Sequence, residues 1–143
     1  MIMSRIRIQL PEHFPFSMLI PVRITDLNYG GHVGNDTILT LVHEARMQFL
    51  KNYGYTEMVL EGVGMIMIDA GIEFRTEVFY GDQVKILVAA TEFSRAGFNL
   101  YYKLMKNETI VAIAKTGMVC YDYDKKKVVS VPAKAIEKLN VPR

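Results

Sequence analysis

The stretch NDTILTLVHEARMQFLKNY, Asn35 to Tyr53, decides the fold because it predicts one long amphipathic helix. Apolar residues recur in it three and four positions apart, which is the spacing of one helical face. These residues are Ile38, Leu41, Val42, Ala45, Phe49 and Leu50. Gly34 or Asn35 can cap the start, Asp36 falls in the first turn, and Gly54 follows the end. At 3.6 residues per turn the helix is about five turns long.

The chain on both sides of this helix has the alternating pattern of β-strands. From Gly64 onward the period is two, which predicts a long strand with one core face and one outer face. The core face is predicted to carry Ile66, Ile68, Ala70, Ile72 and Phe74, and the outer face Asp69, Glu73, Arg75 and Glu77. Turn signals then separate three more long strands, over 84–94, 98–106 and 109–124. Two N-terminal strands are predicted over 5–10 and 18–25, and a short terminal helix over 132–139.

This order of elements predicts an α+β fold. A strongly curved antiparallel sheet of about five to six strands, wrapped around a long central helix, buries the most apolar surface. The other sheet face and the edge strands favour self-association. We expect one domain over residues 1–143, because the length is usual for one domain and no repeat or linker interrupts it.

Composition argues against several classes of protein. The formal charge of +2 is too small for a nucleic-acid footprint, and the basic run at Lys125 to Lys127 suits a hairpin turn. No apolar run approaches the ~20 residues needed to span a bilayer, and the N-terminus lacks the apolar segment of a signal peptide. The single cysteine, Cys120, fits a reducing compartment. We therefore expect a cytoplasmic protein without a nucleic-acid or membrane partner.

The densest polar cluster is RITDLNYGGHVGND, Arg23 to Asp36, immediately before the helix. It supplies a carboxylate, an amide, an imidazole and a helix N-terminus, whose free N–H groups stabilise developing negative charge. Acyl transfer needs such groups. Turn chemistry is the alternative, because aspartate and asparagine side chains readily bond their own backbone.

Three motifs in this order resemble the hotdog-fold acyl-CoA thioesterases, in the 4-hydroxybenzoyl-CoA thioesterase-like branch. They are DLNYGGHVGN at 26–35, HEAR at 43–46 and FRTEVFYGD at 74–82. The resemblance runs from Val22 to Leu139 and includes the ending MVCYDYDKKKVVSVP. It implies hydrolysis of an acyl thioester to free acid and coenzyme A, with no metal or cofactor beyond the coenzyme A of the substrate. It also implies a homodimer, or a tetramer of two dimers, with active sites at the dimer interface.

The resemblance also implies site residues. In such enzymes a backbone N–H at the helix N-terminus, aligned here with Gly34 or Asn35, polarises the thioester carbonyl. Their catalytic aspartate lies three residues before the glycine that aligns with Gly31, and this chain has Asn28 there. Our hypothesis is that Asp26 is the base, Asn28 positions water or the carbonyl, and His32 orients the loop. Tyr29, Gly31 and Arg95 are the predicted substrate contacts. Arg95, in the turn SRAG, is a candidate for the coenzyme A phosphates because a planar guanidinium suits phosphate oxygens, and a solvated turn arginine is the alternative.

The replacement at Asn28 leaves other functions open. A non-catalytic acyl-CoA-binding protein is one alternative, and an enoyl-thioester hydratase is a weaker one because the loop is one residue longer than the hydratase motif. Glu44, in the middle of the helix, is expected to share a polar face with Gln48 and Lys51. Asp69 is expected in a solvated or interface position. The acyl group, and the choice between coenzyme A and a carrier protein, stay undetermined at this stage.

Overall fold

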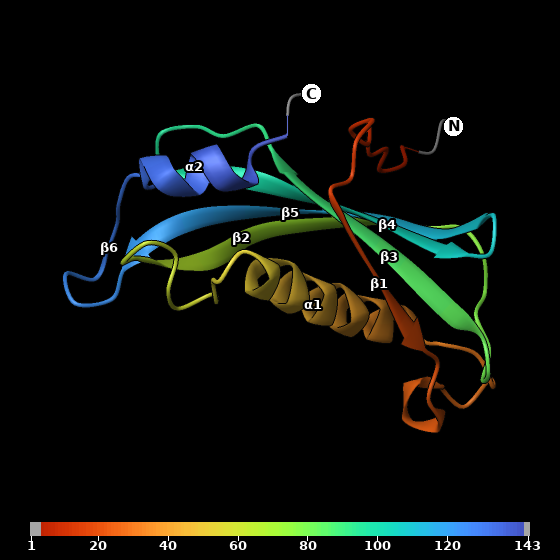
Figure 1. Cartoon of the computed structure of the whole chain (residues 1–143). Coiled ribbons are helices and arrows are strands. Elements are labelled where there is room, and N and C mark those ends of the chain that lie inside the picture. Colours follow the sequence, from red (N-terminus) through yellow and green to blue (C-terminus); the bar gives the residue numbers. More distant parts are fainter. Residues whose placement is uncertain (1–3, 142–143) are drawn as a thin grey trace.

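The computed structural model describes residues 4–141. The chain forms a six-stranded antiparallel sheet and two α-helices, an α+β architecture (Figure 1). The strands are β1 (Phe16–Pro21), β2 (Gly64–Phe74), β3 (Gln83–Thr91), β4 (Gly97–Lys106), β5 (Thr109–Asp122) and β6 (Lys127–Val128). The helices are α1 (Asn35–Asn52), α2 (Ala133–Leu139) and a 3-10 turn at Ile24–Asp26.

The strand order is β1-β3-β4-β5-β2, with the short β6 paired to the end of β5. β1 and β2 are therefore the two edges of the sheet. Pro21 ends β1 at this edge of the sheet, a position that suits proline because it has no N–H to donate to a neighbouring strand. Lys125 and Lys126 lie in the predicted hairpin turn, which joins β5 to β6, and Lys127 begins β6.

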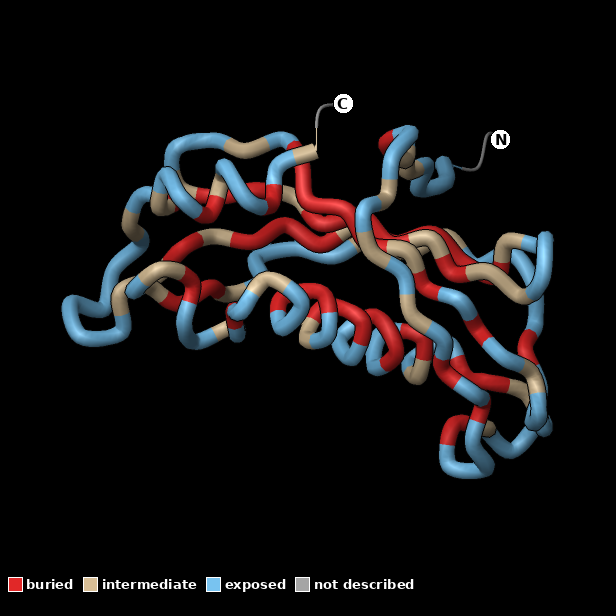
Figure 2. Tube along the Cα trace, viewed as in Figure 1, coloured by how far each residue is buried: buried red, intermediate tan, exposed pale blue. Residues whose placement is uncertain are grey.

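α1 lies along one face of the sheet, and its 18 residues confirm the helix predicted from the apolar spacing (Figure 1). Every apolar residue of the predicted stripe is buried, and Figure 2 shows this stripe turned toward the strands. The core beneath it comes mainly from alternate residues of β3 and β4, with Val84, Ile86, Val88, Leu100, Tyr102 and Leu104 all inaccessible to solvent. Gly34 is the N-cap, and Gly54 has a φ of 81° just beyond the helix end.

Of the two predicted N-terminal strands, the first is absent and the second is present with different bounds. Residues 5–10 form no strand, and the second strand covers Phe16–Pro21, with the 3-10 turn in place of its predicted last residues. The alternation in 5–10 has another cause. The segment crosses the sheet, and Ile6 and Ile8 approach Gly71 of β2 from the side opposite α1 (Figure 1).

The predicted faces of β2 are also wrong in part. Ile68 is an extra residue, because Met67 pairs with Met118 and Asp69 pairs with the next residue, Gly117. This bulge reverses the alternation, so Met65 is buried and Ile68 is 61% exposed. β2 ends at Phe74, so Arg75 and Glu77 follow the strand instead of belonging to it.

Candidate active site

The loop before α1 closes into a tight turn. Leu27 forms a bridge with Val33, and the Asn28 N–H donates to the His32 carbonyl at 2.9 Å. The Gly31 N–H donates to the Asn28 carbonyl at 3.1 Å, with a Gly31 φ of 81° that favours glycine. These bonds hold Asn28 and His32 against the start of α1.

The first turn of α1 carries free backbone donors. Gly34 makes no side-chain cap, and no group within residues 4–141 accepts the N–H of Gly34, Asn35 or Asp36. Unpaired N–H groups at a helix start, together with the helix dipole, stabilise negative charge. The helix start can therefore bind an anion or a carbonyl oxygen that is becoming one.

A pocket of about 310 Å³ opens at this helix start. His32, Asn35 and Ile38 line it from the loop and α1, and residues 74–78 with Val111 line it from the ends of β2 and β5. The His32 Nδ1–H donates to the Val33 carbonyl at 3.1 Å, because a carbonyl oxygen only accepts. In the neutral ring, Nε2 then carries the lone pair, and it lies 3.9 Å from Glu77 Oε1.

Asp26 is buried beside Arg23 and does not line this pocket. Its Oδ2 accepts the Arg23 backbone N–H at 2.8 Å and Nε–H at 3.2 Å, and its Oδ1 accepts Nη2–H at 3.1 Å. Burial raises the pKa of Asp26, but these hydrogen bonds from Arg23 outweigh it and leave the pKa below its usual range. The predicted base is thus a carboxylate already occupied by a guanidinium.

Asn28 has a defined role in the turn. Its Oδ1 accepts the Gly30 N–H at 2.8 Å, which is the Asx-turn chemistry considered as the alternative to a catalytic role. Its side chain also lies beside the helix start, since a Cβ built on Gly34 would be 3.8 Å from Asn28 Nδ2.

The predicted substrate contacts do not gather in one place within the chain. Tyr29 is fully exposed at the turn. Arg95 lies between β3 and β4, at the end of the sheet away from the pocket. Gly97 pairs with Val119 of β5, whereas Phe74 at the pocket pairs with Ala112. Along β5, Val119 and Ala112 are seven residues apart, which corresponds to about 23 Å.

The sequence prediction missed the segment that follows β2. Phe74, Arg75, Thr76 and Glu77 all line the pocket. The alternating pattern continued the strand through Arg75 and Glu77, although β2 ends at Phe74. The motif FRTEVFYGD at 74–82 contributes to the resemblance, but no residue of it was among the predicted site residues. The signal that a loop begins there is Thr76, which stands between two charged residues where the alternation calls for an apolar one.

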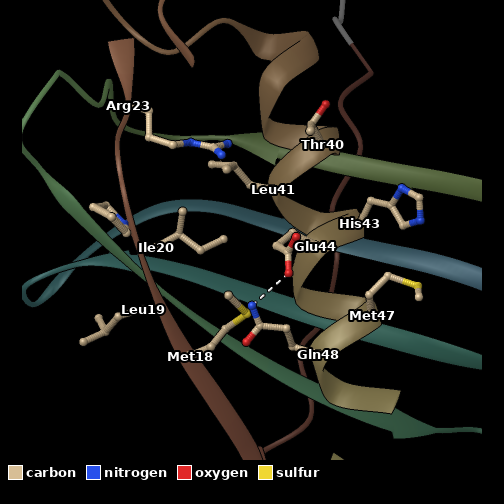
Figure 3. Close-up of a pocket in the computed structure, with 11 residues that line it drawn as sticks. Met18, Leu19, Ile20, Arg23, Thr40, Leu41, His43, Glu44, Met47 and Gln48 are labelled. Atoms are coloured by element: carbon tan, nitrogen blue, oxygen red, sulfur yellow. Dashed lines mark hydrogen bonds between the residues drawn. The ribbon is translucent and has the colours of Figure 1, made fainter. Parts of the chain in front are cut away.

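A second pocket, of about 470 Å³, lies between β1 and α1 (Figure 3). Met18 and Ile20 face it from β1, and Glu44 accepts a hydrogen bond from Gln48 Nε2 at 2.8 Å. This bond confirms the polar helix face predicted for Glu44. Arg23 borders this pocket as well.

Comparison with known proteins gives consistent matches. The model of the family described as the thioesterase-like superfamily matches residues 22–139. A 1,4-dihydroxy-2-naphthoyl-CoA hydrolase of Microcystis aeruginosa is 30% identical over 121 residues, 82% of this chain and 86% of that protein. The crystal structure of a protein from Aquifex aeolicus is 27% identical with a TM-score of 0.79, covering 87% of this chain and 99% of that one.

A solved 1,4-dihydroxy-2-naphthoyl-CoA thioesterase from Synechocystis also has the same fold. Its TM-score is 0.77 at 23% sequence identity, and the match covers 87% of this chain and 96% of that chain. No helix within residues 4–141 is long and apolar enough to cross a membrane.

Proposed function

Because the chain belongs to the thioesterase-like superfamily, we propose that it hydrolyses an acyl-CoA thioester to a free acid and coenzyme A. The observation that carries the proposal is the set of unpaired N–H groups on Gly34, Asn35 and Asp36 beside the 310 Å³ pocket. In the proposed reaction these donors stabilise the negative charge that develops on the thioester oxygen. Such a donor is worth ~3 to 4 kcal/mol in other hydrolases.

The reaction we propose needs no metal and no redox cofactor. Water adds its oxygen to the thioester carbon while a base takes one of its protons. The carbon–sulfur bond then breaks, and coenzyme A leaves as a thiolate that recovers the proton. The pocket volume lies near the lower end of the range for small-molecule sites, so it suits the acyl end of the substrate.

The geometry favours His32 over Asp26 as the base. His32 lines the pocket, and because its Nδ1–H donates to the Val33 carbonyl, its Nε2 keeps a lone pair that can accept a proton. The Asp26 carboxylate instead accepts three hydrogen bonds from Arg23. A carboxylate whose pKa is lowered is also a weaker base. Asp26 keeps the predicted role only if Arg23 moves away from it.

A panel of short, long and aromatic acyl-CoAs, assayed for thiol release, tests the proposal. The Microcystis relative is named for an aromatic acyl-CoA, so the aromatic arm includes 1,4-dihydroxy-2-naphthoyl-CoA. We expect turnover above background with at least one of them. Absence of turnover with all three chain classes would refute hydrolysis.

Two matched variants distinguish the bases. His32→Asn keeps a donor near the Val33 carbonyl and removes Nε2, so we expect kcat to fall about a hundredfold or more. Asp26→Asn keeps an acceptor for the Arg23 N–H, and we expect kcat to change less than tenfold, below the usual effect of losing a base. The reverse result would assign the base to Asp26.

Asn28 favours a second function, the binding of acyl-CoA without hydrolysis. Asn28→Asp preserves the oxygen that accepts the Gly30 N–H and adds the carboxylate found in the resembling enzymes. If the wild type binds acyl-CoA without releasing thiol and Asn28→Asp releases it, the non-catalytic function is correct. If the wild type releases thiol, it is excluded.

We also propose that two chains associate through β2 to form a homodimer, which can pair again into a tetramer. β2 is an edge of the sheet, and its exposed side chains include Met67, Ile68 and Phe74. Met65 of β2 belongs to the core, and Met67, Ile68 and Phe74 stay exposed along the rest of the strand. A second copy on this edge would cover apolar surface and lie beside the pocket, which Phe74 also lines.

A further inference from the structure

Arg5, Arg7 and Arg75 gather at the end of β2, on the sheet face away from α1. They line a hollow of about 640 Å³, together with Ile6 and residues 72–74. The N-terminal segment is anchored there, because the Ile8 N–H donates to Glu73 Oε2 at 2.5 Å. Ile6 and Ile8 also rest above Gly71, each within 3.8 Å of a Cβ built on it. The arginines of this segment are therefore held beside Arg75.

This arginine cluster carries an excess of positive charge. Arg75 Nη2 lies 3.5 Å from Glu73 Oε1, and this carboxylate is already bonded to the Ile8 N–H. Within residues 4–141, Arg5 and Arg7 have no hydrogen-bond or ion-pair partner. The lining of the hollow thus has three guanidinium groups and one carboxylate, that of Glu73, and its net charge is positive by two.

The hollow adjoins the pocket at the start of α1. Phe74 and Arg75 line both, so Arg75 stands between them. A ligand that places its reactive end at the helix start can therefore extend past Phe74 to the arginine cluster. The proposed substrate carries its phosphates at the end remote from the thioester, and the hollow offers positive charge next to the pocket for that end.

We propose that Arg5, Arg7 and Arg75 bind the nucleotide phosphates of the coenzyme A thioester, an inference that rests on the proposed function. The guanidinium fork pairs two N–H donors with two phosphate oxygens, so three arginines suit a group with several phosphates. The volume of the hollow is that of a small-molecule site. A carrier protein would need a docking surface of about 800 Å² on each partner, and its prosthetic arm ends without the nucleotide.

Titration with adenosine 3′,5′-bisphosphate, the phosphate-bearing part of coenzyme A, tests the site without requiring catalysis. We expect calorimetry to show binding by the wild type and a loss of affinity of about tenfold in Arg75→Gln and in the double variant Arg5→Gln/Arg7→Gln. The affinity should also fall as salt is added, because the three arginines are solvent-exposed. Adenosine without phosphates is the ligand control and should not bind.

Two further variants sharpen the test. Glu73→Gln keeps an acceptor for the Ile8 N–H and removes the one negative charge, so it should tighten binding of the bisphosphate. Arg95→Gln removes the same charge as Arg75→Gln at the position first predicted for phosphate, and it should leave the affinity unchanged. Opposite signs at Glu73 and Arg75 are not expected from a general loss of stability.

The outcomes separate this inference from the proposed function. If the wild type fails to bind the bisphosphate, or if only Arg95→Gln weakens binding, the arginine cluster is not the phosphate site, whether or not acyl-CoA is hydrolysed. If the cluster binds the bisphosphate but no acyl-CoA is hydrolysed, the site stands and hydrolysis fails. Where hydrolysis occurs, the double variant Arg5→Gln/Arg7→Gln should raise KM for an acyl-CoA and leave KM for the matching acyl-pantetheine unchanged, because neither residue lines the pocket at the helix start.

Discussion

Asp26 and Arg23 form the most concentrated charge pair of the loop before α1. The Asp26 side chain is 5% exposed and its carboxylate accepts three hydrogen bonds, while the Arg23 side chain is 62% exposed. Such a pair stabilises the turn more than an exposed ion pair does, because the bonds to a buried carboxylate are charge-assisted. We expect Asp26→Asn to lower the free energy of unfolding at neutral pH by about 1 to 2 kcal/mol, measured by urea denaturation.

The same residue gives a pH prediction with a defined sign. The Asp26 pKa is lowered in the folded chain, since the bonds from Arg23 outweigh burial. A lowered carboxyl pKa stabilises the fold above the unfolded value of about 3.9, and this stabilisation is lost as pH falls through the folded pKa. The melting temperature of the wild type should therefore fall more steeply in acid than that of Asp26→Asn.

Asp124→Asn is the control for this dependence of the melting temperature on pH. Asp124 is exposed in the turn after β5, so in Asp124→Asn the melting temperature should fall in acid as steeply as it does in the wild type. If the melting temperatures of the wild type and Asp26→Asn fall equally steeply in acid, the bonds from Arg23 do not lower the pKa of Asp26.

At the scale of elements, a buried polar chain joins α1 to the sheet. Arg46 Nη1 donates to the Tyr102 hydroxyl at 3.2 Å, and that hydroxyl shares a hydrogen bond with Thr116 Oγ1 at 2.8 Å. Glu57 approaches from the loop after α1, with Oε2 lying 3.6 Å from Arg46 Nε and Oε1 bonded to His43 Nε2 at 2.8 Å. The HEAR motif thus places two side chains on α1 against the same carboxylate.

Removing the Tyr102 hydroxyl should weaken this attachment. Tyr102→Phe leaves the buried Arg46 guanidinium and the Thr116 hydroxyl each short of one partner. We expect a loss of about 1 to 3 kcal/mol in the free energy of unfolding, the usual cost of an unsatisfied buried group. Tyr29→Phe, at a fully exposed tyrosine, should cost nothing measurable in the same urea titration. Equal stabilities for both variants would mean that the polar chain adds no net stability.

The start of β4 depends on a close approach of two backbones. A Cβ built on Gly97 would lie 2.4 Å from the Met118 carbonyl oxygen of β5. Gly97→Ala forces the strands apart, and we expect it to cost about 1 to 3 kcal/mol, as overpacking does. Gly71→Ala in β2 is the control, since its nearest neighbours would lie at 3.8 Å. Thermal unfolding should separate the two variants, and similar melting temperatures would show that β5 adjusts freely.

For the whole molecule, the sequence predicted the elements that show a regular apolar pattern between clear turn signals. α1 was predictable because its apolar residues all face the sheet, and β3 to β5 because turns with clear signals separate them. The faces of β2 were not, because the bulge at Ile68 depends on pairing with Met118 and Gly117, some 50 positions away. Residues 5–10 alternate because Ile6 and Ile8 face the sheet surface, which local sequence cannot tell from strand pairing.

The candidate site was predictable in its composition and less so in its geometry. The loop, the helix start and His32 follow from the sequence between a strand-like run and a helix, and the structure places His32 and Asn35 at one pocket. The partners that determine the state of each group differ in their distance along the chain. Arg23 binds Asp26 from three residues away, but only the 3-10 turn at Ile24–Asp26 brings the two together, which the strand pattern did not predict. The segment around Glu77 closes the pocket from more than 40 residues away and depends on how the chain folds back on itself. The catalytic roles assigned to these residues stay predictions.

Association through β2 can be tested by a pair of matched substitutions at the two edges of the sheet. Ile68 on β2 and Leu19 on β1 are each 61% exposed, so a change to lysine removes the same kind of apolar surface from either edge. If β2 is the interface, Ile68→Lys buries a charge on association, and the dimer should dissociate with a loss of several kcal/mol.

Sedimentation velocity measures the outcome. We expect a dimer or tetramer for the wild type and for Leu19→Lys, and a monomer for Ile68→Lys at the same concentration. Because the pocket adjoins β2 at Phe74, the monomer should also lose acyl-CoA turnover. Its melting temperature should fall because association no longer stabilises the folded chain, and its circular dichroism at room temperature should stay that of the wild type. A monomeric Leu19→Lys beside an associated Ile68→Lys would transfer the interface to β1 and to the pocket between β1 and α1.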